Sequence, residues 1–269
     1  MYKSFQTDTF KKGESKVKSS VDILDFDEGY KSQSYYKKLD YSWIDLSDIK
    51  NVNRYCEESS LKSIYNRIIN KKHSKVTFIG NGNYHYVTYL LLKDIKKPFT
   101  LVLFDHHTDM MDAPSKSLVT CGSWVSNAIN NLPNLKKVII IGVSQELIYS
   151  NIIDNKDKVA ILSKENIGQA KTVNEYIKSN TVTDEIYISV DKDVLAYTDA
   201  STNWDQGNMK LEDLLNSINY MCNNYKILGL DVCGEYYSSP CEYFNPQTIK
   251  SIKVNDKANL AILKEIEYV

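Results

Sequence analysis

Residues 105–109 are the segment of this chain with the greatest density of side chains that can do metal chemistry. They read Asp-His-His-Thr-Asp and directly follow a run of apolar residues. Alternate side chains of an extended segment point the same way, so Asp105, His107 and Asp109 should share one face. Carboxylates mixed with imidazole suit divalent ions such as Mn²⁺. The spacing therefore predicts that His107 binds metal and that His106 packs or supports it from the other side.

Two other segments place ionisable residues directly after an apolar run. Residues 189–193 read Ser-Val-Asp-Lys-Asp, so Asp191 and Asp193 should share a face, and His85 follows the run at 75–80. Carboxylates at this density cannot all be ionised side by side without a compensating cation. A single Asp-x-Asp is often a turn or a solvated surface, but three such groups after three strands favour a metal site. Six ligands are too many for one open catalytic ion and fit two.

Strand and helix patterns alternate along the chain and indicate how these residues meet. The predicted strands cover 21–27, 75–80, 99–105, 136–143, 158–163, 185–191 and 226–232. The predicted helices cover 57–72, 84–95, 123–132, 172–180, 211–222 and 258–269. This alternation predicts a three-layer α/β/α fold with a mostly parallel sheet. The site of such a sheet lies at the carboxyl ends of its strands. The segment 35–48 could add a strand or a lid.

Length, charge and cysteine content restrict the classes of function. The chain has 269 residues and a formal net charge of −1, which suits a single α/β domain over 1–269 without a basic surplus for nucleic acid or anionic membranes. No window has the apolar length to span a bilayer. The first residues carry no apolar export signal, and the five cysteines form no Cys-x-x-Cys pair, so we expect a cytoplasmic protein. Only Arg54 and Arg67 are arginines, which weakly disfavours a polyanionic substrate.

The order of these motifs resembles the ureohydrolase superfamily of arginases, agmatinases and formimidoglutamases. That family has a Gly-Gly-Asp-His, an Asp-x-His-x-Asp and a Ser-x-Asp-x-Asp segment, and the similar stretches here are 80–85, 105–109 and 189–193. The motifs spread over roughly residues 75–240, whereas 1–70 match poorly. The resemblance implies an arginase-like fold, a small-molecule substrate and a homo-oligomer.

The resemblance also implies a dinuclear manganese centre in which every ligand position is filled. Asp105 and Asp191 would bridge the two ions. The implied reaction is hydrolysis of a linear C–N bond in a guanidino or amidino compound by a hydroxide that bridges the ions. Asp109 would orient that hydroxide, and Glu235, in a segment similar to the family's Asp-x-x-Glu, would face the metals and grip the guanidinium. The implied metal ligands are His85, Asp105, His107, Asp109, Asp191 and Asp193.

The chain departs from the family at positions that bear on the substrate. Cys121 stands where arginases and agmatinases have a proton-shuttle histidine. A thiol with a pKa of about 8.5 could act as an acid, could be a small buried hydrophobe or could mark a different reaction. Met111 occupies the place of an asparagine that recognises the amino-acid end in arginases, which disfavours L-arginine. The remaining histidine, His73, lies at a lysine-rich helix end and is expected at the surface.

Two alternatives to a ureohydrolase-like enzyme remain open. A divergent metal-dependent hydrolase with another substrate would account for Cys121. A non-catalytic metal-binding relative would be marked by broken ligand positions, and no ligand position is broken here.

Overall fold

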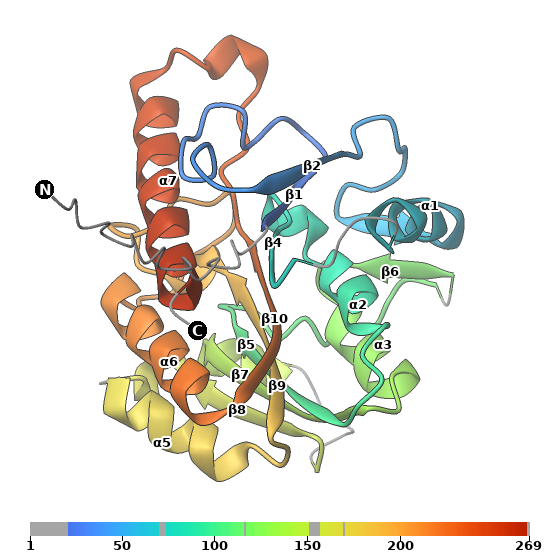
Figure 1. The fold of residues 1–269 in the computed structure, drawn as a ribbon, viewed down its shortest axis with the longest axis vertical. Helices are drawn as coiled ribbons and strands as arrows, with labels where there is room; N and C mark the ends of the chain where they lie inside the picture. Colours follow the sequence, from blue (N-terminus) through green and yellow to red (C-terminus); the bar gives the residue numbers. More distant parts are fainter. Residues whose placement is uncertain (1–20, 70–73, 116, 151–156, 169, 268–269) are drawn as a thin grey trace, which may run out of the picture.

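The main element of the fold is one eight-stranded sheet (Figure 1). The structure is a computed structural model, and it describes residues 21–69, 74–115, 117–150, 157–168 and 170–267. The strand order is β2-β1-β4-β10-β9-β5-β7-β8, and all neighbouring strands are parallel. The strands are β1 (Val21–Asp25), β2 (Tyr41–Asp45), β4 (Val76–Phe78), β5 (Phe99–Phe104), β7 (Leu135–Val143), β8 (Val159–Ser163), β9 (Glu185–Asp191) and β10 (Lys226–Cys233). The predicted surface histidine His73 lies outside the described residues.

Helices cover both faces of this sheet (Figure 1). They are α1 (Glu58–Ile69), α2 (Val87–Leu92), α3 (Trp124–Asn131), α4 (Gln145–Ser150), α5 (Ala170–Asn180), α6 (Leu211–Asn224) and α7 (Pro246–Glu267). One hydrophobic core lies under α5, α6 and α7, and a second lies under α1, α2 and α3. The predicted three-layer α/β/α fold with a mostly parallel sheet is confirmed.

The central strands read as continuous apolar runs because both of their faces are covered. All six residues of β5 are buried, and so are the last six residues of β7 and of β9. Because both faces are buried, these runs do not alternate between apolar and polar residues. The ionisable side chains come after β5, where the chain leaves the space between the helical layers. The fold therefore concentrates ionisable residues at one edge of the sheet.

Helix α7 differs from the sequence-based expectation. Helix α7 begins at Pro246 rather than near residue 258. The sequence did not predict its first half, because the buried face there is polar and carries Thr248, Ser251 and Asn255. The start of α7 is set by Asn245, whose side chain accepts from the Gln247 backbone N–H at 3.0 Å, and by proline at the first helical position. The segment 35–48, expected to add a strand or a lid, adds a strand, because it contains β2 at the edge of the main sheet.

A short antiparallel pair stands apart from the main sheet. It joins β3 (Tyr55–Glu57) to β6 (Leu118–Thr120), and it was too short to be predicted from periodicity. Its importance is positional, because Arg54 precedes β3 and Cys121 follows β6. The Cys121 backbone N–H donates to the Arg54 carbonyl oxygen at 2.9 Å, so the two residues are held together.

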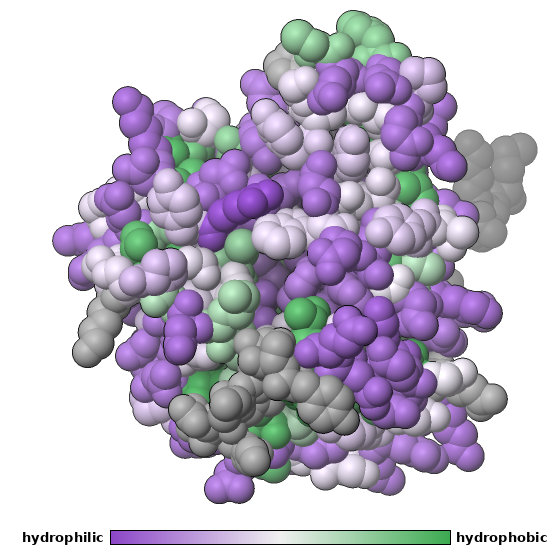
Figure 2. All heavy atoms as spheres, turned by 180° about the vertical axis from the view of Figure 1, so that it is seen from behind, coloured by the Kyte–Doolittle hydropathy of each residue, from purple (hydrophilic) through white to green (hydrophobic). Residues whose placement is uncertain are grey.

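The surface seen from behind is mainly hydrophilic, with hydrophobic side chains in small separate groups (Figure 2). In the part of the chain that the structure describes, no helix is both long and apolar enough to cross a membrane.

Candidate metal centre

Three strands in the middle of the sheet, β4, β5 and β9, deliver the candidate ligands, and β10 lies between β4 and β9. Strands β4, β10, β9 and β5 lie side by side, and their carboxyl ends meet at one edge. The chain leaves β4 through a 3₁₀ turn at Gly82–Tyr84 and reaches His85. Strand β5 leads into Asp105, His107 and Asp109, and β9 ends at Asp191, which is followed by Asp193. Residues that are far apart in sequence are therefore gathered by topology.

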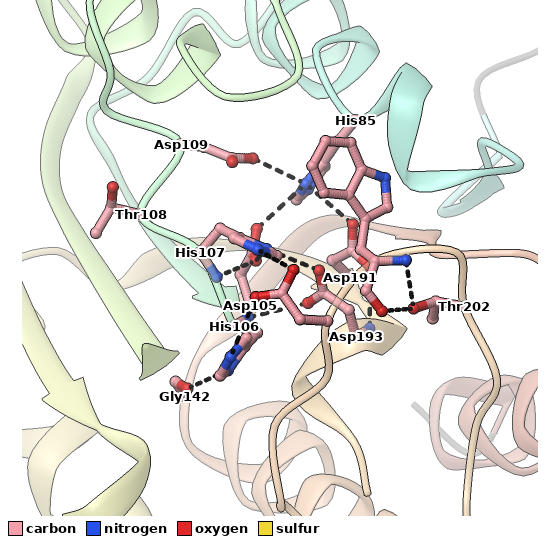
Figure 3. Close-up of polar contacts among 12 residues, drawn as sticks. His85, Asp105, His106, His107, Thr108, Asp109, Gly142, Asp191, Asp193 and Thr202 are labelled. Carbon is pink, nitrogen blue, oxygen red and sulfur yellow. Dashed lines mark hydrogen bonds and ion pairs between the residues drawn. The ribbon is translucent and has the colours of Figure 1, made fainter. Parts of the chain in front are cut away.

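His85 lies at the centre of one group of ligands (Figure 3). Its Nδ1 atom is 3.1 Å from Asp109 Oδ2, 3.3 Å from Asp105 Oδ2 and 3.6 Å from Asp191 Oδ2. The other ring nitrogen, Nε2, is 3.0 Å from the Ser189 hydroxyl oxygen. A polar partner on the far nitrogen fixes the orientation of an imidazole so that Nδ1 faces the carboxylates.

His107 belongs to a second group, which His106 does not join. The His107 Nδ1 atom is 2.9 Å from Asp193 Oδ2 and 3.6 Å from Asp105 Oδ1. His106 has a different partner, since its Nδ1 atom is 3.4 Å from the Gly142 carbonyl oxygen (Figure 3). The backbone N–H of His106 nevertheless donates to Asp193 Oδ1 at 3.0 Å. His107 and His106 thus have different partners, as expected, but 105–109 is not a regular extended segment, because it bends at 106–107 and Thr108 also lines the cavity.

The donor atoms of these groups fit divalent cations. His85, Asp105 and Asp109 offer ligand atoms within 4.8 Å of one another, and so do Asp105, His107 and Asp193. Asp105 is common to both groups, and its buried Oδ2 atom has no hydrogen-bond partner although His85 is near. A buried carboxylate oxygen without a partner is costly unless a cation binds it. Two nitrogens with carboxylate oxygens are a donor set that suits Mn²⁺.

The pKa directions describe a site that holds protons when no cation is bound. Burial and the charge of Asp105 raise the pKa of Asp109 to about 6. Burial and the charge of Asp191 raise the pKa of Asp193 well above its usual range. Burial lowers the pKa of His107, but hydrogen bonds with Asp105 and Asp193 outweigh it and raise that pKa to about 12. A metal ion would take the place of these protons, because metal ligands must be deprotonated.

Two glycines allow the chain to approach Asp191 closely. A Cβ atom on Gly82 would lie 3.0 Å from Asp191 Oδ2, and one on Gly234 would lie 2.5 Å from Asp191 Oδ1. Gly234 also has a φ of 85°, a left-handed conformation that favours glycine. Both positions would crowd the carboxylate if they carried a side chain.

Asp109 is held in place by the first turn of α3. The Trp124 indole N–H donates to Asp109 Oδ2 at 2.5 Å, and the Asp109 carbonyl oxygen accepts from the Val125 backbone N–H at 3.0 Å. Asp109 itself has a φ of 50°. These contacts fix the direction of the Asp109 carboxylate independently of a metal ion.

A cavity of about 490 Å³ opens over the candidate ligands. Cys121 lines it together with Gly122 and Met111, which is 60% exposed. Burial and the charge of Asp109 raise the pKa of the Cys121 thiol to about 12. The thiol is therefore protonated near neutral pH.

The structure places Glu235 elsewhere than the family resemblance implied. Its carboxylate does not line the cavity but lies in a buried network, where it forms an ion pair with Lys192. Asn259 Nδ2 donates to its Oε1 at 2.7 Å, and Gln33 Nε2 donates to its Oε2 at 2.6 Å. Gly234, with a φ of 85°, directly precedes Glu235. The expectation that Glu235 grips a guanidinium beside the metals is therefore corrected, because its hydrogen-bonding capacity is used behind the site.

Three residues near the ligands were not singled out from the sequence. Cys233 Sγ lies 3.1 Å from Asp191 Oδ2 and forms a possible ligand group with His85 and Asp191. Its position at the end of β10 was the available signal. Trp204 and Arg54 line the cavity from segments that carry no motif, so only the tertiary structure brings them to the site.

Comparison with known proteins gives the family. The model of the arginase family matches residues 15–236, and the chain belongs to this family. A protein of Thermotoga maritima described as uncharacterized is 33% identical over 247 residues, which is 91% of this chain and 89% of that protein. The matched region begins well before the first motif.

Solved structures share the fold at low sequence identity. Proclavaminate amidino hydrolase from Streptomyces clavuligerus has a TM-score of 0.66 at 15% identity, over 94% of this chain and 92% of that one. Formimidoylglutamase from Bacillus subtilis has a TM-score of 0.65 at 17% identity, over 95% and 89% of the two chains. The membership of the ureohydrolase superfamily predicted from the motifs is confirmed, and the fold is that of its hydrolases.

Proposed function

We propose that this chain is a dinuclear manganese hydrolase that cleaves a linear C–N bond of a guanidino or amidino compound. The observation that carries the proposal is the convergence of six imidazole and carboxylate side chains from three strand ends on the floor of one cavity. Family membership supports the same reaction class.

The two ligand groups define which residues would hold each ion. His85, Asp105 and Asp109 would hold one, and Asp105, His107 and Asp193 the other. Asp191 lies 3.6 Å from His85 Nδ1 and would add its carboxylate to the ligands of the centre. Two divalent cations would balance the four aspartate charges of the site.

The side chains around the cavity have separable tasks in the proposed reaction. When bound, the two ions supply Lewis acidity that makes hydroxide available near neutral pH. Asp109, fixed by Trp124, accepts a hydrogen bond from the attacking oxygen and orients it toward the electron-poor carbon. The C–N bond then breaks and the departing nitrogen takes a proton. Cys121, whose thiol stays protonated beside Asp109, is the candidate donor.

A panel of guanidines and amidines tests the proposal. Protein loaded with Mn²⁺ should release urea from a guanidine, or an amide from an amidine, together with the corresponding amine. Metal-free protein and an Asp105→Asn variant should release neither. If the loaded protein contains its metal and hydrolyses no member of the panel, the proposed activity is wrong.

A divergent substrate is the second candidate, and Cys121 is the observation that favours it. The cavity has a thiol where arginases and agmatinases have a histidine. Cys121→His should introduce arginase- or agmatinase-type activity if the proton donor limits the reaction. If the variant has an unchanged substrate profile, the shape and charge of the cavity determine the substrate instead.

The expected homo-oligomer and the expected cytoplasmic location stay predictions. Light scattering on the purified, metal-loaded protein would establish the first.

A further inference from the structure

Arg54 is a cation at the wall of the cavity whose charge the candidate metal centre does not use. It is an exposed side chain that lines the same cavity as His85 and the aspartates. Its backbone is tied to the site, because its carbonyl oxygen accepts from the Cys121 N–H at 2.9 Å. With a φ of 66°, Arg54 is held in a left-handed conformation that arginine rarely adopts.

The guanidinium group of Arg54 stacks on an aromatic ring and has no anionic partner in the part of the chain that the structure describes. Its central carbon lies 5.1 Å from the centroid of Trp204. Among the described residues, no carboxylate lies within 4.0 Å of it, whereas Arg67 is paired through both terminal nitrogens with Asp48. The exposed carboxylate of Asp205 lies 3.7 Å from His107 Nε2 instead. Stacking uses the face of a guanidinium and leaves its N–H edges free for a carboxylate.

Trp204 connects this cation to the metal-ligand edge of the cavity. Its ring centroid is 5.6 Å from that of His107, and its indole N–H donates to Asn83 Oδ1 at 3.0 Å. The Trp204 ring is thus a fixed platform with the guanidinium of Arg54 on it. The rest of the wall, formed by Met111, Pro114 and Leu118, offers apolar contact for methylene groups.

The positive charge of Arg54 favours some substrates over others according to the charge of the group at the end remote from the guanidine. With two divalent ions bound, the four aspartates of the centre are neutralised, and Arg54 remains as an uncompensated positive charge. A second cation at the far end of a guanidine would be repelled by it, and an anion would be attracted. The apolar wall and a single guanidinium fit one carboxylate better than a polyanion.

We propose that Arg54 binds the carboxylate of a guanidino or amidino acid, so that the substrate is a zwitterion with its carboxylate remote from the reacting carbon. This inference rests on the proposed function and names its substrate class. The reacting group lies over the metal ligands, the methylene chain contacts the apolar wall, and the carboxylate lies against the edge of the Arg54 guanidinium.

Matched pairs of substrates test the role of Arg54. Manganese-loaded protein is assayed with 3-guanidinopropanoate, 4-guanidinobutanoate and 5-guanidinopentanoate, and with alkylguanidines and (aminoalkyl)guanidines of the same lengths. The wild type should prefer the best acid over its neutral and cationic counterparts. Arg54→Gln should lower kcat/KM for that acid by about 10- to 100-fold, mainly through KM, and leave the alkylguanidine within about 3-fold. Arg54→Lys should retain part of the preference, and Arg67→Gln is the matched control.

Separate outcomes overturn the inference and the proposed function. An equal loss for acids and alkylguanidines in Arg54→Gln would assign Arg54 to support of Trp204 and overturn the inference, and so would a preference of the wild type for cationic tails. If no guanidine or amidine is hydrolysed, the proposed function fails, and calorimetric titration of the metal-loaded protein with 4-guanidinobutanoate then decides on Arg54. Binding that Arg54→Gln weakens by about 10-fold or more supports the carboxylate site, and the absence of Arg54-dependent binding overturns it.

Discussion

His107 and Asp193 contact each other directly across the sheet edge, with Nδ1 2.9 Å from Oδ2. The adjacent His106 faces the Gly142 carbonyl instead. Neighbouring residues of the same type therefore have different surroundings: the chain bends at 106–107 directly after β5, and only the ring of His107 reaches the carboxylates of Asp105 and Asp193. This difference makes the assignment of the metal ligands testable one residue at a time.

Replacement of His107 should remove metal binding, and replacement of His106 should not. His107→Ala deletes a nitrogen of the second ligand group, so bound Mn²⁺ per chain should fall and any metal-dependent activity should be lost. His106→Ala keeps the backbone N–H that donates to Asp193 and should mainly lower stability, by about 1–2 kcal/mol. Metal analysis after gel filtration measures the first effect and urea unfolding the second. The reverse pattern would overturn the assignment.

Loss of the Glu235 charge should destabilise the fold rather than weaken substrate binding. Glu235 and Lys192 are both buried, so Glu235→Gln leaves a buried cation without its counter-charge and should cost about 3–5 kcal/mol in urea unfolding. Adding Lys192→Met should recover part of this loss. Glu28→Gln, which breaks the exposed pair with Lys31, is the matched control and should change little. If the Glu235→Gln protein is as stable as the wild type but binds substrate more weakly, Glu235 contacts the substrate and its assignment to the buried network is wrong.

The stability of the protein should depend on pH through Asp27. Burial raises the pKa of this carboxyl from 3.8 to about 6, so the folded state holds the proton more tightly than the unfolded chain. The protonated carboxyl contributes stability fully below its unfolded pKa of 3.8, and this contribution is lost as the pH rises through its folded pKa of about 6. Asp27→Asn should therefore gain about 1–2 kcal/mol at pH 7 and almost nothing at pH 4. An equal gain at both pH values would contradict this titration.

Cys121 should react slowly with alkylating agents in the metal-free protein. Burial and the charge of Asp109 raise its pKa to about 12, so the reactive thiolate is scarce at pH 7.5. Iodoacetamide should modify the exposed Cys241 more than about 100-fold faster, as followed by peptide mass spectrometry. Comparable rates at the two cysteines would show that Cys121 is a thiolate and therefore not the proton donor.

The sequence predicted the fold, and it predicted which ionisable side chains gather at the strand ends, because both depend on local patterns. Buried parallel strands read as apolar runs, and the ionisable residues follow such runs. The sequence could not place Glu235, because the left-handed conformation of Gly234 and the buried partner Lys192 depend on packing. The first half of α7 was not predicted because the residues that it buries are polar and give no apolar repeat of helical period.

The residues of the cavity wall could not be predicted from the sequence, for a different reason. Arg54 and Trp204 come from separate segments, one before β3 and one in a loop after β9. Neither lies in a motif, and the stacking of their side chains exists only in the folded chain. A substrate preference that depends on them can be inferred from the tertiary structure but not from motif spacing.

The number of metal ions per chain tests the central claim most directly. Metal-free protein is loaded with Mn²⁺, passed through gel filtration and analysed by inductively coupled plasma mass spectrometry. The arrangement of His85, His107 and the four aspartates predicts two ions per chain. One ion or none, in protein that remains folded, would contradict a dinuclear centre.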